Sequence, residues 1–300
     1  SNRFKNGAYA ENNVFFREVN TDLLLNYRKE LGKFSVDVSA GGNRMDQTAS
    51  FDQYQALSLA QPGVFKLNNA ASPVEVFQNV ADKRINSLYG LVKLGFKDVL
   101  FVDITGRNDW SSTLATPTST ANVSFFYPSV SASWVLSNQF NLPYYWSFAK
   151  IRASVANVGN DTNPYQTTGV FNAKTPVYSQ PTFSDQNFIA NANLKPESTT
   201  SYEVGADVRF FGDRLGFDVT YYDALTTNQI LSVPITLATG YSERVINGGS
   251  IRSRGVEAIV TYVPVLTKDI RWNVNLNFSR NRTTVESLPD EAGTLTLGYN

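Results

Sequence analysis

The feature that most constrains this chain is an alternation of apolar and polar side chains, which recurs through most of its 300 residues. In the clearest segment four apolar residues alternate with four polar ones: Trp272, Val274, Leu276 and Phe278 against Asn273, Asn275, Asn277 and Ser279. Successive side chains of a β-strand point to opposite faces, so this segment predicts a strand with one apolar and one polar face. The alternating stretches reach about ten residues, the length of a tilted strand that crosses a membrane.

About ten segments show this pattern. They cover residues 20–28, 33–43, 84–96, 99–107, 125–136, 149–158, 202–210, 215–222, 254–264 and 270–282. Tight turns are expected at 29–32, 97–98, 212–213 and 266–269, and long loops rich in Asn, Thr, Pro and Gly at 44–82, 159–198 and 228–252. Such alternation of short and long connections is typical of outer-membrane barrels, whose long loops gather on one rim. The predicted fold is therefore all-β, an antiparallel up-and-down transmembrane β-barrel.

Composition supports this interpretation and removes several others. The chain holds 20 Phe and 15 Tyr against one Met, a mixture that favours strands over helices. No apolar run approaches the roughly 18 to 20 residues of a membrane-spanning helix. Basic and acidic residues number 26 each, so net charge directs the chain neither to nucleic acid nor to an anionic surface. Cysteine and histidine are absent, which excludes disulfides, thiolate catalysis and cysteine-based metal sites.

The main structural alternative is a soluble β-sandwich, whose strands also alternate between a core-facing and a water-facing side. Aromatic residues lie near the ends of the apolar faces, as in an interfacial girdle: Phe96, Phe210, Tyr221, Tyr262 and Trp272. The polar faces hold few Lys, whereas water-facing strands of soluble sheets usually carry many Lys and Glu. Both observations favour the membrane barrel. The residues expected to face lipid include Leu215, Phe217, Val219, Trp272, Val274 and Leu276.

A series of short motifs follows the order found in one family of membrane barrels. The motifs are GRNDWSSTL (106–114), FYPSVSASW (126–134), AKIRAS (149–154), VGNDTNPY (158–165), LKPESTTSYEVG (194–205), FFGDRL (210–215), YY (221–222), TGY (239–241), NGG (247–249) and GVE (255–257). Together they resemble the barrel of SusC-like TonB-dependent transporters. No single motif is specific, but their order across residues 84–288 indicates the family. Residues before 84 fit the same barrel by their alternation alone.

The resemblance implies a barrel of about 22 strands that is filled by an N-terminal plug. It also implies energy coupling through TonB, a SusD-like lipoprotein lid, and import of oligosaccharides or peptides across the bacterial outer membrane, with lipid around the barrel and no enzymatic activity or cofactor. The sequence shows no plug, TonB box, carboxypeptidase-like extension, signal-peptide core or closing aromatic strand. We therefore expect residues 1–300 to form one partial barrel domain, with the plug and closing strands outside this chain. The first and last strands should then pair with segments other than each other.

Charged residues on the polar faces are candidates for the barrel interior. Glu203, Asp207 and Arg209 share one face of a predicted strand, and Arg107 and Arg152 occupy inward positions elsewhere. Two carboxylates could indicate a glycosidase, but Glu203 and Asp207 would lie about 13 Å apart along a strand. That separation exceeds the roughly 5 to 9.5 Å used by such enzymes. Ion pairing in the lumen or contact with a plug is favoured instead, and no catalytic residue is assigned.

The long loops and strand ends supply aromatic residues. Candidates for contact with substrate or lid are Phe171, Tyr178, Phe183, Tyr165, Tyr241 and Trp110. Aromatics among amides suit a surface that binds sugars or peptides, but loops also need aromatic anchors for their own packing. Packing at the membrane rim is favoured for Trp110. Residues 159–162 lack the spaced acids and terminal Glu of a calcium loop, so no metal site is predicted.

Two functions remain open from the sequence. One is active import together with a lid lipoprotein, and the other is a passive porin-like or adhesive barrel without energy coupling. A plug and a TonB box before Ser1 would indicate the first, and a direct start into strands would indicate the second. The substrate depends on loops, plug and lid together, so these residues do not define it.

Overall fold

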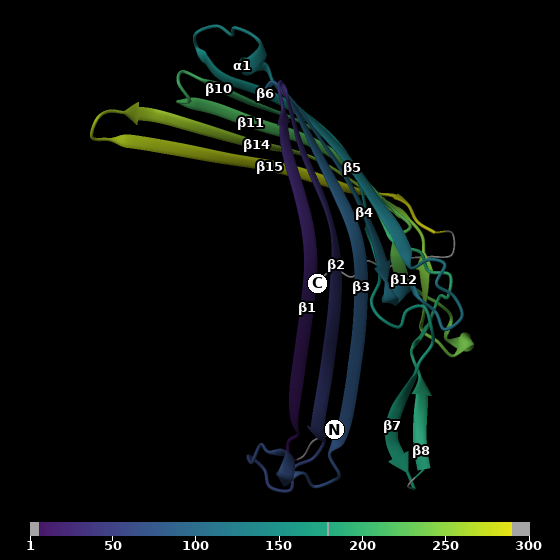
Figure 1. Ribbon diagram of the computed structural model, residues 1–300. Coiled ribbons are helices and arrows are strands. Elements are labelled where there is room, and N and C mark those ends of the chain that lie inside the picture. Colours follow the sequence, from purple (N-terminus) through teal and green to yellow (C-terminus); the bar gives the residue numbers. More distant parts are fainter. Residues whose placement is uncertain (1–5, 179, 290–300) are drawn as a thin grey trace.

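A computed structural model describes residues 6–178 and 180–289, and its main feature is one ten-stranded sheet (Figure 1). In spatial order the strands are β1 (Tyr9–Leu31), β2 (Phe34–Ala56), β3 (Glu75–Phe96), β4 (Leu100–Ser111), β5 (Ser124–Val135), β6 (Trp146–Asn160), β10 (Glu197–Phe210), β11 (Leu215–Thr227), β14 (Ser250–Leu266) and β15 (Arg271–Ser287). Every neighbouring pair is antiparallel. All ten predicted strands and their up-and-down order are therefore confirmed.

The sheet is open. β1 and β15 are its two edges, and they do not pair with each other. In lipid each unpaired backbone N–H or C=O costs several kcal/mol, so membrane sheets close on themselves. The described strands are thus part of a barrel wall and not a small complete barrel, as predicted.

The pairing register divides the sheet into two faces. In β5, Val130 has Ile104 and Val155 as lateral neighbours, whereas the next residue, Ser131, lies beside Asp103 of β4. Exposed and partly covered residues alternate along this strand from Ser124 to Ser133. We call the apolar side the outer face and the polar side the inner face.

The outer face is uncovered in the described part of the chain. Trp272 and Leu276 are 58% and 62% exposed, and Val219 is 41% exposed. The other residues predicted to face lipid are partly exposed: Leu215, Phe217 and Val274. Among the described residues no second sheet packs against this face, because the two smaller sheets are formed by the long connections. The sandwich alternative is therefore wrong, since its apolar faces would be buried between two sheets.

The first three strands are longer than the sequence indicates. β1 begins at Tyr9 instead of near residue 20, β2 continues to Ala56, and β3 begins at Glu75. The predicted loop 44–82 is therefore wrong, and the connection covers only 57–74. Phe51, Tyr54 and Phe77, which were expected in that loop, lie on strands.

The reason is that the hydrophobic signal stops where the strand leaves lipid. From Arg44 onward both faces of β2 carry polar residues, so an apolar period no longer marks the strand. The backbone ladder nevertheless continues to the pair Gln55–Glu75. β1–β3 therefore extend past the ends of their neighbours (Figure 1).

The other long connections contain structure that the sequence did not indicate. The segment between β6 and β10 holds a hairpin, β7 (Phe171–Val177) and β8 (Gln180–Asp185), and a short strand, β9 (Phe188–Ile189). β9 joins β12 (Ile230–Pro234) and β13 (Glu243–Asn247) in a three-stranded sheet. The remaining elements are short: η1 (Leu67–Asn69), η2 (Ser112–Leu114), α1 (Leu136–Gln139) and η3 (Leu237–Thr239). In the described part of the chain, no helix is long and apolar enough to cross a membrane.

Antiparallel order sends the connections after β2, β4, β6 and β11 to one rim, which we call the loop rim. The connections after β1, β3, β10 and β14 are tight and lie at the opposite end together with α1, as predicted. In one of these turns Lys97 and Asp98 both have positive φ, 53° and 54°. Two left-handed residues are what a two-residue hairpin turn requires, because its twist then matches that of the strands.

A small hydrophobic core lies at the loop rim. Leu114, Leu194 and Val245 are almost fully buried and come from three different connections. Val233 and Ile246 form a second cluster within the small sheet. These contacts hold the long connections against one another, so the rim is a folded platform and not a set of separate loops.

The two faces should respond differently to charge. Val130→Arg places a cation in the middle of the outer face and should destabilise the folded barrel by about 2–4 kcal/mol. The adjacent Ser131→Arg, which points to the polar inner face, should cost far less. The measurement is urea unfolding of the full-length receptor in lipid vesicles, and equal losses would contradict this assignment of the faces.

Candidate functional site: the inner face and the loop rim

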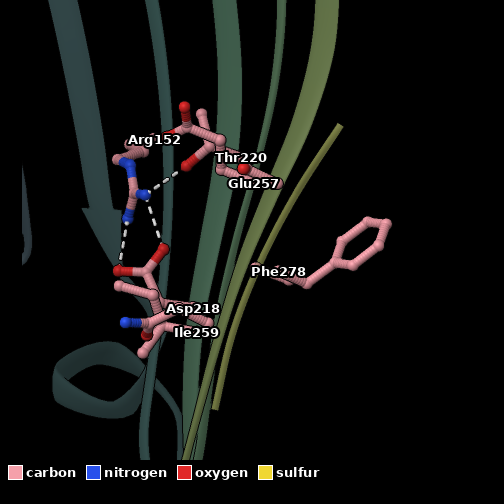
Figure 2. Close-up of a pocket in the computed structure, with 9 residues that line it drawn as sticks. Arg152, Asp218, Thr220, Glu257, Ile259 and Phe278 are labelled. Carbon is pink, nitrogen blue, oxygen red and sulfur yellow. Dashed lines mark hydrogen bonds and ion pairs between the residues drawn. The ribbon is translucent and has the colours of Figure 1, made fainter. Parts of the chain in front are cut away.

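The inner face carries an ion pair that crosses a strand. Arg152 of β6 reaches over Gly205 of β10 to Asp218 of β11, donating at 2.6 Å and 3.2 Å to the two carboxylate oxygens. The same guanidinium donates to Oγ1 of Thr220 at 2.6 Å (Figure 2). A Cβ on Gly205 would lie 2.7 Å from Nε of Arg152. The glycine therefore permits a bidentate pair between two strands that are not neighbours.

A polar hollow of about 310 Å³ lies beside this pair on the inner face. Besides Arg152 and Asp218, its polar lining includes Thr220, Glu257, Asn277 and Ser279. Figure 2 shows Phe278 on the other side of the sheet, as strand alternation requires. The hollow can hold polar groups of a plug or a solute through hydrogen bonds.

The sequence pattern indicated Arg152 as an interior residue but did not indicate its partners Asp218 and Thr220, nor Glu257. Their polar side chains belong to alternating segments that were recognised as strands. What the sequence did not show is the register that sets Gly205 between Arg152 and Thr220. The cross-strand glycine was the available signal, because a glycine inside a strand often marks the close approach of another group.

The other predicted interior residues also lie on the inner face. Arg209 donates to Asp207 at 2.8 Å, and its guanidinium lies 4.8 Å from the ring centroid of Phe148. Glu203 is exposed on the same face of β10. It stands four residues along the strand from Asp207, so the two carboxylates do not form a close pair.

Arg107 completes this set on β4. It donates to Asp109 and to Oγ of Ser87, both at 2.7 Å, and lies 5.6 Å from the ring centroid of Tyr89. Each of the three predicted arginines is thus paired with a carboxylate on the inner face. The arrangement gives a wall of fixed, locally neutralised charges.

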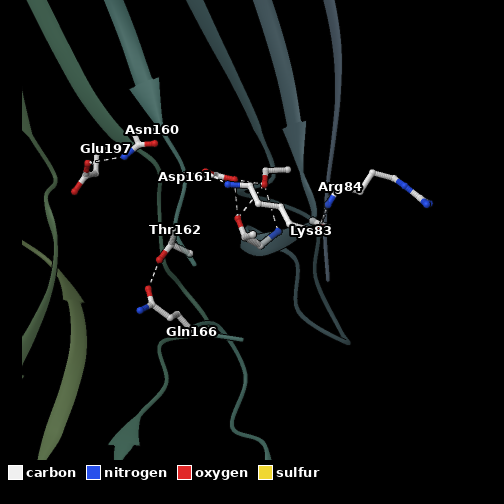
Figure 3. A network of polar contacts seen from close by, with 10 residues as sticks. Lys83, Arg84, Asn160, Asp161, Thr162, Gln166 and Glu197 are labelled. Carbon is white, nitrogen blue, oxygen red and sulfur yellow. Dashed lines mark hydrogen bonds and ion pairs between the residues drawn. The ribbon is translucent and has the colours of Figure 1, made fainter. Parts of the chain in front are cut away.

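Asp161, directly after β6, is the centre of a polar network at the loop rim (Figure 3). Its side chain is 7% exposed and accepts from Nζ of Lys83 at 2.6 Å, from Oγ1 of Thr113 at 3.0 Å and from Oγ of Ser111. A lysine therefore neutralises the carboxylate in the segment that superficially resembles a calcium loop. In the part of the chain that the structure describes, no group of three His, Cys, Asp or Glu could hold a metal ion.

A second carboxylate, Glu197, lies across a polar hollow of about 370 Å³ from Asp161. Glu197 accepts from the backbone N–H of Ile230 at 2.9 Å and from Nδ2 of Asn160 at 3.3 Å. Thr162 donates to Gln166 at the edge of the same hollow (Figure 3). The two carboxylates thus join β6 and β10 to strand β3, to the end of β4 and to the connections that follow β4 and β11.

The predicted contact aromatics fall into three places. Phe171, Tyr178 and Phe183 are on the β7–β8 hairpin and are 71%, 96% and 64% exposed. Tyr165 and Tyr241 lie in the long connections after β6 and β11. The backbone N–H of Asp82 donates to the Tyr165 hydroxyl, and the Tyr241 hydroxyl donates to Asp185, both at 3.5 Å. Figure 1 shows the hairpin continuing outward from the sheet along the strand direction, and not folded back over it.

Trp110 differs from these aromatics because it lies on the outer face. It is near the end of β4, paired with Asn86 and Ser124, and it is 37% exposed. An aromatic ring at this level is what a membrane-interface girdle contains. Trp110 therefore lies on the outer face of β4, whereas three of the other predicted aromatics lie on the β7–β8 hairpin.

The outer face of β1–β3 shows where the apolar band ends. Leu88 of β3 is exposed to the outside, whereas Arg84 on the same face pairs with Asp46 of β2. Asp46 also accepts from Arg44 at 2.7 Å. Hydrogen bonds from Arg44 and Arg84 lower the pKa of the Asp46 carboxyl. These exposed ion pairs indicate that the extended parts of β1–β3 lie in water beyond the membrane.

An apolar outer face, a charged inner face and a folded loop rim define the wall of an outer-membrane barrel. The chain belongs to the TonB-dependent receptor-like β-barrel family, whose sequence profile matches residues 1–300. The resemblance drawn from the motifs and the outer-membrane location are thereby confirmed.

Individual relatives agree with this assignment. TonB-dependent receptor P26 of Formosa agariphila is 27% identical over 297 residues, covering 92% of this chain and 29% of that protein. TonB-dependent receptor SusC of Bacteroides thetaiotaomicron is 30% identical over 99 residues, which are 33% of this chain and 10% of SusC.

Among solved structures, the RagAB peptide importer in its closed-closed state superposes with a TM-score of 0.80 at 19% identity, covering 96% of this chain and 32% of that chain. The ferripyoverdine receptor of Pseudomonas aeruginosa gives 0.57 at 13% identity, covering 93% and 34%. This chain therefore spans about a third or less of these proteins.

Gly205→Ala should break the cross-strand pair and lower stability by about 1 kcal/mol, a modest loss because Arg152 and Asp218 are each more than a third exposed. The matched control is Gly90→Ala, where an added Cβ would have its nearest neighbour 3.8 Å away. The free energy of unfolding of each variant, measured alone and in combination with Arg152→Gln, gives the coupling energy between the glycine position and Arg152. If Gly205→Ala costs as much without Arg152 as with it, the crossing pair is not the reason for the glycine.

Proposed function

We propose that the protein containing these strands imports oligosaccharides or peptides across the outer membrane, driven by TonB and assisted by a SusD-like surface lipoprotein. The family match over residues 1–300 carries this proposal. Similarity to SusC and to the RagAB peptide importer supports the choice of substrate class and of a lipoprotein partner. The relatives named above are TonB-dependent receptors. Asp207 and Asp218 are cross-strand neighbours on the inner face, and each is held by an arginine.

The geometry suits a plugged importer. Paired arginines and carboxylates on the inner face offer hydrogen bonds to a plug without leaving an uncompensated charge in the wall. The network around Asp161 and the core at Leu114 hold the long connections in one shape. A rigid rim is a suitable seat for a lid, because little order must be gained when the lid closes.

Loss of TonB should abolish uptake, since the proposed transport needs energy coupling. The first step is to identify a nutrient on which growth depends on the receptor. A receptor-deletion strain and the same strain with the receptor restored are grown on a panel of oligosaccharides and peptides. Uptake of that nutrient is then measured with TonB present and absent, at equal surface expression. Uptake that persists without TonB would favour the passive porin-like alternative, and growth independent of the receptor on every nutrient would contradict import itself.

The hairpin aromatics should contribute to capture of substrate or lid. Replacing Phe171, Tyr178 and Phe183 by Ala removes three exposed rings, and we expect uptake or lid association to fall about tenfold or more, as when contact aromatics are truncated. The control removes three exposed rings at the opposite end of the sheet: Phe140, Tyr144 and Tyr145. Unchanged uptake and unchanged lid binding in the hairpin variant would show that those rings serve only the loop.

A further inference from the structure

One edge of β3 is open where the strand extends beyond its neighbour at the loop rim. β3 pairs with β2 along its whole length from Glu75 to Phe96, whereas its pairing with β4 begins only at Ile85, opposite Ser111. Residues 75–84 therefore have one edge bonded to β2 and a second edge that no strand of the sheet covers. β3 is the third strand of the wall, and both of its wall neighbours are described, so this open edge is not an end of the sheet.

Strand alternation identifies the backbone donors along the open edge. The N–H of Arg84 donates to Oγ of Ser112 at 2.9 Å, and the N–H of Asp82 donates to the hydroxyl of Tyr165 at 3.5 Å, so both point away from β2. Every second residue of an antiparallel strand directs its N–H to the same side. The next three donors on this edge belong to Val80, Gln78 and Val76. In the described part of the chain these three donors have no backbone or side-chain acceptor.

This edge has none of the features that usually protect an exposed strand. Natural edge strands are shielded by Lys, Pro or β-bulges. Residues 75–81 contain neither Lys nor Pro, and their register with β2 shows no bulge. Val76, Phe77 and Val80 are 53%, 42% and 53% exposed. An extended, partly apolar and unshielded edge is what the addition of another strand requires.

A groove of about 530 Å³ runs along the open edge, and the β7–β8 hairpin forms its other wall. Its lining comprises Val74 and residues 76–80 on one side and residues 170–174, at the start of β7, on the other. β7 pairs with β8 along one edge and makes no backbone hydrogen bond to β3. Figure 1 shows both elements at the loop rim, beyond the ends of the neighbouring strands. Two strands that each lack a second neighbour thus line one groove.

The free groups of this groove match an extended main chain. Alternate residues of a strand repeat about every 6.8 Å, the spacing at which an extended peptide presents its own C=O and N–H groups. A sugar chain has no such repeat of donors and acceptors. Lys174 is the one charged side chain that lines the groove. The groove therefore suits recognition of the peptide backbone, whereas a protein partner held in a fixed register needs pockets or charge pairs for its side chains.

We propose that the groove between β3 and β7 binds an extended peptide, which adds a strand to the open edge of β3, and that such peptides are among the molecules the receptor imports. This inference rests on the proposed import and selects peptides from its two substrate classes. Main-chain hydrogen bonds hold peptides of many sequences, as an importer of mixed peptides requires. Tyr165 occupies the edge donor of Asp82 and so sets the inner end of the bound strand.

The test is fluorescence anisotropy of a labelled peptide of alternating Thr and Val, titrated with the purified full-length receptor. Gln78→Pro removes the central free donor and leaves the ladder to β2 intact, because the N–H of residue 78 points away from β2. It should weaken binding about fivefold or more, the loss expected for one hydrogen bond. The matched control, Gln78→Thr, changes the same side chain but keeps the N–H, and it should bind like the wild type.

Two further ligands test the chemistry on the wild-type receptor. The same peptide, N-methylated throughout, keeps its side chains but cannot pair with a strand edge, so its binding should fall about tenfold or more. Maltohexaose should not compete with the peptide. Equal binding of the methylated and unmethylated peptides, or competition by the sugar, would overturn the proposal. Equal binding by a folded Gln78→Pro receptor and the wild type would do the same.

Heat-modifiable migration of the barrel shows whether each variant has folded, and the methylated peptide tests the proposal even if the proline variant does not fold. If Gln78→Pro weakens association with the lid and leaves peptide binding unchanged, the edge is a lid contact and the proposal is wrong. Binding to the purified receptor needs no TonB. Its failure is therefore distinguishable from a failure of energised import, which is measured as uptake by cells.

Discussion

The continuous ladder of backbone hydrogen bonds from β1 to β15 is the interaction on which the rest of this structure depends. In hydrocarbon no water is available for a free N–H or C=O, so each strand must pair on both sides. Pairing in chain order makes every second connection return to the same rim. The two different ends of the wall, one with tight turns and one with a folded platform, are consequences of that requirement.

The ladder leaves side chains free to form a second set of contacts across the inner face, and glycines determine where these occur. Arg152 crosses Gly205 to reach Asp218. In the same way Tyr89 lies over Gly41 of β2, and its hydroxyl donates to Asp22 of β1 at 3.0 Å. In both cases a residue without a side chain in the middle strand allows contact between the strands on either side. These crossings tie neighbouring pairs of strands together where no hydrophobic core exists.

A hydrophobic core does exist at the loop rim, where the chain leaves lipid and must again exclude water. Leu114, Leu194 and Val245 supply it, and the buried pair of Lys83 with Asp161 adds charge-assisted hydrogen bonds at its edge. The same change of medium explains the outer face. On β15 the outward positions change from Phe278 to Arg280 where the strand leaves the apolar band.

The sequence by itself determined the strands inside the membrane, their two faces and the family. It did so because lipid on one side and a polar lumen on the other force a strict alternation, as from Trp272 to Ser279. It failed for residues 9–19, 44–56 and 75–82, the extensions of β1–β3 beyond the apolar band, where polar residues occur on both faces of the strands. Only the tertiary structure decided that Asp218 is the partner of Arg152 and Lys83 that of Asp161. Those contacts depend on register and on the folding of distant connections, and no local pattern of residues encodes which strands become neighbours.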